Sequence, residues 1–201
     1  SGLANDGAYD WTVSDDDTTD ALVRVRATDS SDNQGADESD AAFEIDSTAP
    51  TVSDLTASNP SGQTVAVSLN ASEPLTDVSV TVTGAASRTL TAADFAETGS
   101  GPYGYTASFD AGTDGVFDAT LATAADAAGN DGAGSESASV EVDTVTPTVS
   151  AFSASNPSGQ SVNVSFESSE RLSATAVELE TPSTTATRSS LSETGSGPYT
   201  Y

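Results

Sequence analysis

The sequence predicts an all-β protein built from tandem Ig-like antiparallel β-sandwich domains of about 97 residues each. The first observation behind this prediction is an internal repeat, because Pro50 recurs as Pro147, 97 positions later. Asn59 recurs as Asn156 at the same spacing. The second observation is that apolar residues alternate with polar ones in short segments between turns, with the period of two that strands need. A period of this length sets the folding unit and therefore the whole architecture.

The repeat divides the chain into the back half of a repeat (residues 1–45), a complete repeat (46–142) and the front half of another (143–201). The two half-repeats together cover one domain, and each alone would expose an apolar face and an open sheet edge. We expect the 201 residues to be a window on a longer array, or else a subunit whose copies complete one another's half-domains. We favour the window. The proline-containing junctions at 46–50 and 143–147 are short and stiff, so successive domains should stack into a rod.

Each strand is placed by its alternating residues and by the turn that ends it. In the complete repeat the expected strands cover residues 52–55, 65–69, 78–82, 88–90, 103–109, 117–124 and 138–142. The flanking parts add strands at 9–13, 22–27, 42–45, 149–152, 162–166 and 176–180, a turn at 15–20, and polar loops at 29–35 and 126–132. When the repeats are aligned, the alternating apolar residues of 22–27 are displaced by one position from those of 117–124. This displacement predicts a bulge or a one-residue insertion.

The charge is one-sided, with 31 acidic residues, 5 basic residues and a net charge of -26. Such a surface repels nucleic acid and anionic membranes, and it favours cations and a salty solvent. At roughly 1 M salt the screening length falls to about 3 Å and the self-repulsion fades. Only 34 of the 201 residues are Leu, Ile, Val or Phe, which predicts a thin core that depends on salt or ions. No apolar run is long enough to span a membrane as a helix.

Several motifs resemble the bacterial and archaeal Ig-like (Big-type) repeats of large surface proteins. The first is Asp-x-Thr-x-Pro-x-Val, at residues 46–52 and 143–149. The others are Ser-Glu-Pro-Leu at 72–75, with Ser-Glu-Arg-Leu at 169–172, and Ala-x-Asp-Ala-Ala-Gly-Asn at 124–130. With this acidity the chain resembles a haloarchaeal surface or filament protein. The resemblance implies an Ig-like fold, a role in stalks, surface layers or fibres, and calcium bound between domains.

Acidic and amide side chains gather at the junctions and in the loop before each last strand, where they could supply the oxygen ligands that calcium prefers. The candidate calcium ligands are Asp29, Asp32, Asn33, Asp46, Asp126, Asn130, Asp131 and Asp143. The alternative for each is that it forms the turn by hydrogen-bonding its own backbone. Calcium is the one cofactor we expect.

Two sequons predict candidate glycosylation at Asn70 and Asn163, although Ser- and Thr-rich chains produce such matches by chance. Histidine is absent and no acidic pair has a distinctive apolar setting, so nothing favours catalysis. The aromatic residues Trp11, Tyr103, Tyr105 and Tyr199 could form a sugar-stacking platform, but their alternation is more typical of a core face.

These patterns favour a non-enzymatic structural protein outside a halophilic cell, as the shaft of a surface filament, stalk or adhesin. Its expected partners are neighbouring repeats or like subunits, and we expect neither nucleic acid nor direct membrane contact. One alternative is an adhesin module that binds surface glycans or cells. Another is a surface-layer component, a viral fibre or the non-catalytic appendage of a secreted hydrolase.

Overall fold

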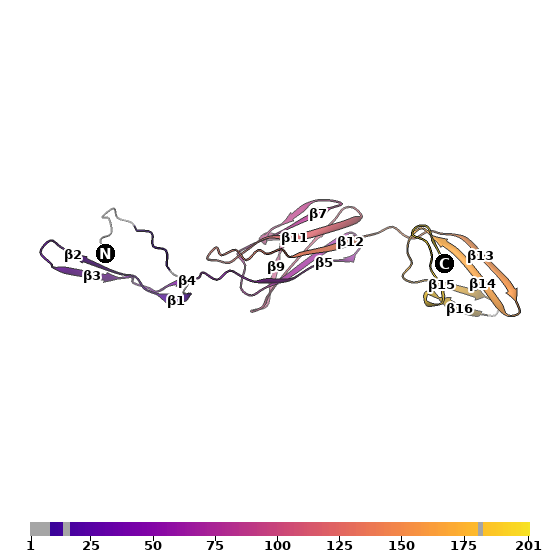
Figure 1. Ribbon diagram of the computed structural model, residues 1–201, viewed down its shortest axis with the longest axis horizontal. Coiled ribbons are helices and arrows are strands. Elements are labelled where there is room, and N and C mark those ends of the chain that lie inside the picture. The colour runs from indigo at the N-terminus through magenta and orange to yellow at the C-terminus, as the bar shows by residue number, and fades with distance from the viewer. Residues whose placement is uncertain (1–8, 14–16, 181–182) are drawn as a thin grey trace. The chain divides into compact units, whose positions relative to one another are not determined.

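The computed structural model describes residues 9–13, 17–180 and 183–201, and its strands are shown in Figure 1. The chain divides into two compact units, Ser1–Asp143 and Thr144–Tyr201. In the described residues every strand pair is antiparallel, and the helical segments are two short 3-10 turns, η1 (Ala92–Asp94) and η2 (Arg188–Ser190). The predicted all-β class is therefore confirmed.

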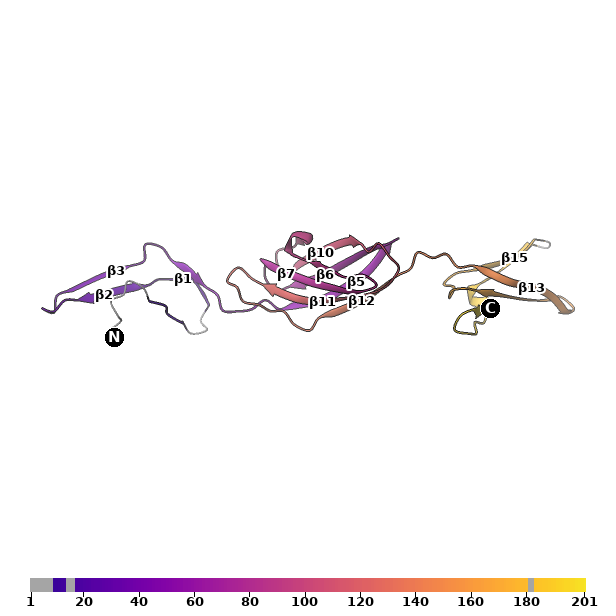
Figure 2. The ribbon, with the colours of Figure 1, turned by 90° about the horizontal axis from the view of Figure 1, so that it is seen from above.

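The complete repeat forms a sandwich of two four-stranded sheets (Figures 1 and 2). The first sheet has the order β5 (Val52–Ser61), β6 (Thr64–Ala71), β10 (Tyr103–Asp110), β9 (Ala96–Thr98). The second has the order β12 (Ser137–Val142), β11 (Gly115–Ala125), β7 (Asp77–Gly84), β8 (Arg88–Leu90).

The core of this sandwich is made by the alternating residues that the sequence singles out. Val65, Val67 and Leu69 of β6 are buried, and the residues between them are only partly buried. From the second sheet, β7 buries Val78, Val80 and Val82 in the same cluster. Successive side chains of a strand point to opposite faces, so each strand gives one apolar row to the space between the sheets.

A buried tyrosine joins three parts of the complete repeat. The Tyr105 hydroxyl donates to Glu97 Oε2 at 2.7 Å and accepts a hydrogen bond from the Leu75 backbone N–H at 2.7 Å. Burial, together with the neighbouring Glu97 carboxylate, raises the pKa of Tyr105 to about 12, although the Leu75 N–H acts in the opposite direction. The core role expected for Tyr105 therefore agrees with its burial.

The second unit repeats the front half of this sandwich. Its strands are β13 (Val149–Ser158), β14 (Ser161–Ser168), β15 (Ala176–Glu180), β16 (Ser183–Thr187) and β17 (Tyr199–Thr200). They form a β13-β14-β17 sheet and a β15-β16 hairpin. The polar contacts repeat as well, because Asn156 Nδ2 donates to the Gly159 carbonyl as Asn59 Nδ2 does to the Gly62 carbonyl. Tyr201 likewise accepts from the Leu172 N–H and donates to Glu193.

The N-terminal part forms two strand pairs, in which β1 (Thr18–Ala21) pairs with β4 (Phe43–Ile45) and β2 (Arg24–Thr28) with β3 (Gln34–Glu38). The strand expected at 9–13 was wrong, because these residues form no strand and Tyr9 and Trp11 are 64% and 67% exposed. The reason is that no described strand pairs with them. Of the turn expected at 15–20, residues 15 and 16 lie outside the described residues, and residues 18–20 were wrongly predicted because they pair with β4 as part of β1. A register shift between Leu121 and Thr123 places the bulge in β11.

Gly132 allows two distant segments of the complete repeat to meet. A Cβ at this position would lie 1.6 Å from the Pro50 carbonyl oxygen, so the loop after β11 runs directly against the backbone of buried Pro50. Its counterpart one repeat earlier, Gly35, has open space at the Cβ position.

We expect Gly132→Ala to destabilise the complete repeat by about 1–3 kcal/mol, because one of the two backbones must shift to admit the methyl group. Gly35→Ala is the matched control and should leave the unfolding midpoint unchanged. Urea unfolding in high salt, followed by circular dichroism, measures both. Equal midpoints for Gly132→Ala and the wild type would contradict the close approach.

Tyr105 also predicts a loss of stability at alkaline pH. The folded protein holds the Tyr105 proton to about pH 12, whereas an unfolded tyrosine releases it near pH 10. The stabilising contribution is therefore complete below about pH 10 and is lost as the pH rises to about 12. Lysine and cysteine are absent, so tyrosine is the side chain that titrates in this range. In Tyr105→Phe this part of the pH dependence should vanish from urea midpoints; an unchanged slope would contradict the assignment.

Candidate cation site at the junction before the complete repeat

Three carboxylates converge where the N-terminal part joins the complete repeat. Asp46 follows β4, Glu73 lies in the loop after β6, and Asp126 follows β11; one carboxylate oxygen from each lies within 4.8 Å of the others. They line a pocket of about 380 Å³ together with Glu44, Pro74, Ala127 and Ala128. A divalent cation prefers oxygen ligands of this kind.

Backbone hydrogen bonds bring the loop that carries Glu73 to the other two carboxylates. The Thr76 N–H donates to the Ala125 carbonyl at 2.8 Å, which places the loop beside the end of β11. At the other end of the loop, the Ser72 N–H donates to the Thr51 carbonyl at 3.0 Å and the Ser72 hydroxyl accepts from the Thr51 N–H at 2.9 Å. The fold thus fixes Glu73 between the junction and the β11 loop.

Asp126 is 4% exposed and holds the loop that follows β11. Its Oδ1 accepts from the backbone N–H groups of Gly129 and Asn130 at 2.7 and 3.0 Å, and its Oδ2 accepts from Asn130 Nδ2 at 2.9 Å. Burial acts to raise the pKa of Asp126, but these hydrogen bonds outweigh it and hold the pKa below the ordinary value. Asp126 is therefore ionised at neutral pH, and its turn-forming contacts leave it beside Asp46 and Glu73.

The junction itself is held from both sides. Asn130 Nδ2 donates to the Asp46 backbone carbonyl at 3.1 Å. From the N-terminal part, Asp17 accepts from the Ser47 N–H and hydroxyl at 2.8 and 2.7 Å, and from the Thr48 hydroxyl. The hydrogen bonds from Thr48 and Ser47 lower the pKa of Asp17. Residues 46–48 therefore have fixed partners on either side of the chain.

The repulsion among these carboxylates acts on Glu73. Burial raises its pKa, and repulsion from Asp46, Asp126 and Asp17 raises it further. Like charges at these distances repel one another, and this repulsion disfavours ionisation of the Glu73 carboxyl. Either a proton or a bound cation would relieve the repulsion.

Of the eight residues predicted to bind calcium, the structure brings Asp46 and Asp126 together and places Asn130 beside them. Asp131 instead accepts from the backbone N–H groups of Ala124 and Ala133, and Asp29 accepts from those of Ser31 and Asn33. Hydrogen bonds from Asn33 and Ser31 lower the pKa of Asp29.

The two remaining candidates have other positions. Asp32 has a φ of 64°, as expected of a turn residue, and Asp143 ends the first unit, 97 positions after Asp46. The sequence analysis did not select Glu73 as a ligand. The pair Ser72-Glu73 recurs one repeat later as Ser169-Glu170, and this recurrence could have identified it.

The two sequons lie on strands, as expected. Asn70 is on β6, partly buried, and its Nδ2 donates to Asp54 Oδ2 at 3.1 Å, so a glycan there would have to replace this contact. Asn163 on β14 is exposed. Of the aromatic residues, Tyr103 packs on the core, Tyr199 is partly buried and Trp11 is exposed.

No protein family, curated protein or solved structure matches this chain. Within the residues that the structure describes, no helix is long and apolar enough to cross a membrane.

Replacing Glu73 tests the electrostatics of the cluster directly. Without divalent cations, Glu73→Gln should stabilise the complete repeat by about 0.5–1 kcal/mol, because it removes one of the repelling charges. Addition of calcium at constant ionic strength should then raise the melting temperature of the wild type more than that of the variant. Glu141→Gln, on an exposed residue of β12, is the control for removing a charge elsewhere.

The direction in which pH changes the folding stability follows from the pKa of Glu73. The pKa of Glu73 is higher in the folded state than its ordinary value, so protonation favours folding, and its destabilising contribution is lost as the pH falls. Glu73→Gln should lose this part of the acid response. A variant no more stable than the wild type, with the same calcium response, would exclude this cluster as a cation site.

Proposed function

We propose that this protein is a non-enzymatic structural segment made of tandem Ig-like repeats, which forms the shaft of a surface filament, stalk or adhesin. The observation that carries the proposal is the fixed junction between residues 45 and 51. It is only five residues long, and Asp17 holds it from one side while Asn130 and Gly132 hold it from the other. A tied junction of this kind restricts bending between successive domains, whereas a flexible linker does not.

The repetition of polar contacts supports the same proposal. The Ser153 and Ser165 hydroxyls are 2.8 Å apart, as are those of Thr56 and Ser68 one repeat earlier. The contact just before the first strand of the repeat recurs as well, because the Thr148 N–H donates to the Ser169 hydroxyl as the Thr51 N–H does to Ser72. Repeats that preserve their internal polar contacts are suited to a regular array.

The charge supports a protein that works in brine. With 31 acidic and 5 basic residues, the chain repels itself at low ionic strength, and concentrated salt removes that repulsion. Calcium at Asp46, Glu73 and Asp126 would further stiffen the junction, with Asn130 as a neighbouring oxygen donor. The glycan-binding alternative stays a prediction, which retention on a glycan array in brine would test.

Labelling of intact cells tests the proposed location and role. Antibodies raised against residues 46–142 should label extended structures on unpermeabilised cells in electron micrographs. Permeabilised cells, with an antibody against an internal protein, control for leakage. Label confined to the cell interior would overturn the proposal.

A further inference from the structure

The turn at residues 46–48 presents three hydrogen-bond donors to the N-terminal part of the chain. Asp46 Oδ1 accepts a hydrogen bond from the Thr48 backbone N–H at 3.0 Å, which closes the turn. The remaining donors of the turn are the Ser47 N–H, the Ser47 hydroxyl and the Thr48 hydroxyl. All three donate to the carboxylate of Asp17.

The pairing of β1 with β4 brings Asp17 to this turn. Thr18 lies opposite Ile45 in the antiparallel pair, so the residue before β1 lies beside the residues that follow β4. Asp17 Oδ1 accepts from the Ser47 N–H at 2.8 Å and from the Ser47 hydroxyl at 2.7 Å, while Oδ2 accepts from the Thr48 hydroxyl. The hydrogen bonds from Thr48 and Ser47 lower the pKa of Asp17, so the carboxylate is ionised at neutral pH and both of its oxygens are engaged.

The other contacts at the junction lie within the complete repeat itself. Asn130 Nδ2 donates to the Asp46 carbonyl, and Gly132 lies against the backbone of buried Pro50. All four residues belong to the complete repeat, so these contacts fix the junction to that repeat and leave the N-terminal part untied. Asp17 supplies the hydrogen bonds that cross from one side to the other.

One repeat later the sequence changes one of the three donors. The counterpart of Thr48 is Val145, whose side chain has no hydroxyl group, whereas the counterpart of Ser47 is Thr144, which has one. Thr48→Val is therefore a change that the repeat itself makes. It removes one donor to Asp17 and keeps the backbone N–H that closes the turn.

We propose that Asp17 is the positioning residue of this junction, and that it acts as a lock on the angle between the N-terminal part and the complete repeat. With the three hydrogen bonds in place, residues 46–48 are held on both sides and the junction bends little. Without them, the pair of β1 and β4 moves relative to the complete repeat while the complete repeat stays folded. The inference rests on the proposed role as a shaft, because it names the residue that stiffens one joint of that shaft.

The lock requires a carboxylate. An ionised aspartate has two acceptor oxygens, which suits the three donors of the turn. Asp17→Asn keeps the size of the side chain but leaves one acceptor oxygen and turns an NH2 group toward a donor. Asp17→Ala removes both acceptors.

Distances between two spin labels in the 201-residue chain test the proposal, because the chain has no cysteine of its own. The labels are attached through Thr19→Cys on β1 and Asp118→Cys on β11, both at exposed positions. In brine, pulsed electron resonance should give a narrow distance distribution for this labelled parent. The distribution should be roughly twofold wider in Asp17→Ala and Asp17→Asn, as for a junction that gains flexibility. Thr48→Val should give an intermediate width.

Asp20→Asn is the matched control, since Asp20 is an exposed residue of β1 that takes no part in these three hydrogen bonds. It removes the same charge and should leave the width unchanged. The melting temperature of the complete repeat, followed by circular dichroism, should be the same in every variant.

Three results would overturn the lock. They are a width that Asp17→Ala leaves unchanged, an equal increase in Asp20→Asn, and an increase accompanied by a lower melting temperature of the complete repeat. These measurements concern one joint in the purified chain, whereas the labelling of intact cells tests where the protein works. Either proposal can therefore fail without the other.

Discussion

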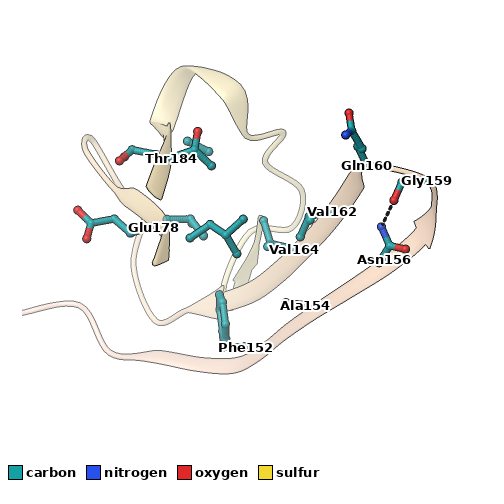
Figure 3. Close-up of a pocket in the computed structure, with 13 residues that line it drawn as sticks. Phe152, Ala154, Asn156, Gly159, Gln160, Val162, Val164, Glu178 and Thr184 are labelled. Carbon is teal, nitrogen blue, oxygen red and sulfur yellow. Dashed lines mark hydrogen bonds between the residues drawn. The ribbon is translucent and has the colours of Figure 1, made fainter. Parts of the chain in front are cut away.

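The apolar face of a β-sheet has to be covered, and this requirement governs every part of the chain. The complete repeat meets it by placing β11 and β12 over β5, β6 and β7, which buries Val65, Val80 and Phe117 in one cluster. The second unit has the same front-half sheet with Phe152 and Val162 uncovered (Figure 3). Hydrophobic burial is the main favourable term in folding, so these positions stabilise the complete repeat, whereas their counterparts in the second unit contribute less.

The negative charge of the chain opposes the packing of one sheet face against another. A net charge of -26 disfavours any compact state and any association between copies at low ionic strength. The effect is concentrated at Asp46, Glu73 and Asp126, where the fold brings three carboxylates together and raises the pKa of Glu73. High salt weakens the general repulsion, and a cation at the cluster would weaken the local one.

The sequence predicts most strands of the complete repeat because their signal is local, but it misses β1, β3 and β9. The alternation at Val65 and Leu69 determines which face is buried, and the repeat transfers that result from one unit to the next. Two of the three carboxylates in the cluster, Asp46 and Asp126, were predicted because they stand at recognisable junction and loop positions. Glu73 joins them through the Thr76 hydrogen bond to Ala125, a contact between residues distant in sequence. Alternation at residues 9–13 failed to predict a strand because it shows which face would be buried and says nothing about whether a partner strand is present.

The central claim is that front and back halves of a repeat are stable only against each other. Amide hydrogen exchange of the 201-residue chain in brine, measured over a range of chain concentrations, tests this claim most directly. Our account predicts that β6 and β7 are protected at every concentration, while β14 and β15, whose apolar face is uncovered, are weakly protected at the highest dilution. Strong protection of β14 and β15 at the highest dilution would show that the front half is stable alone, and would contradict the account.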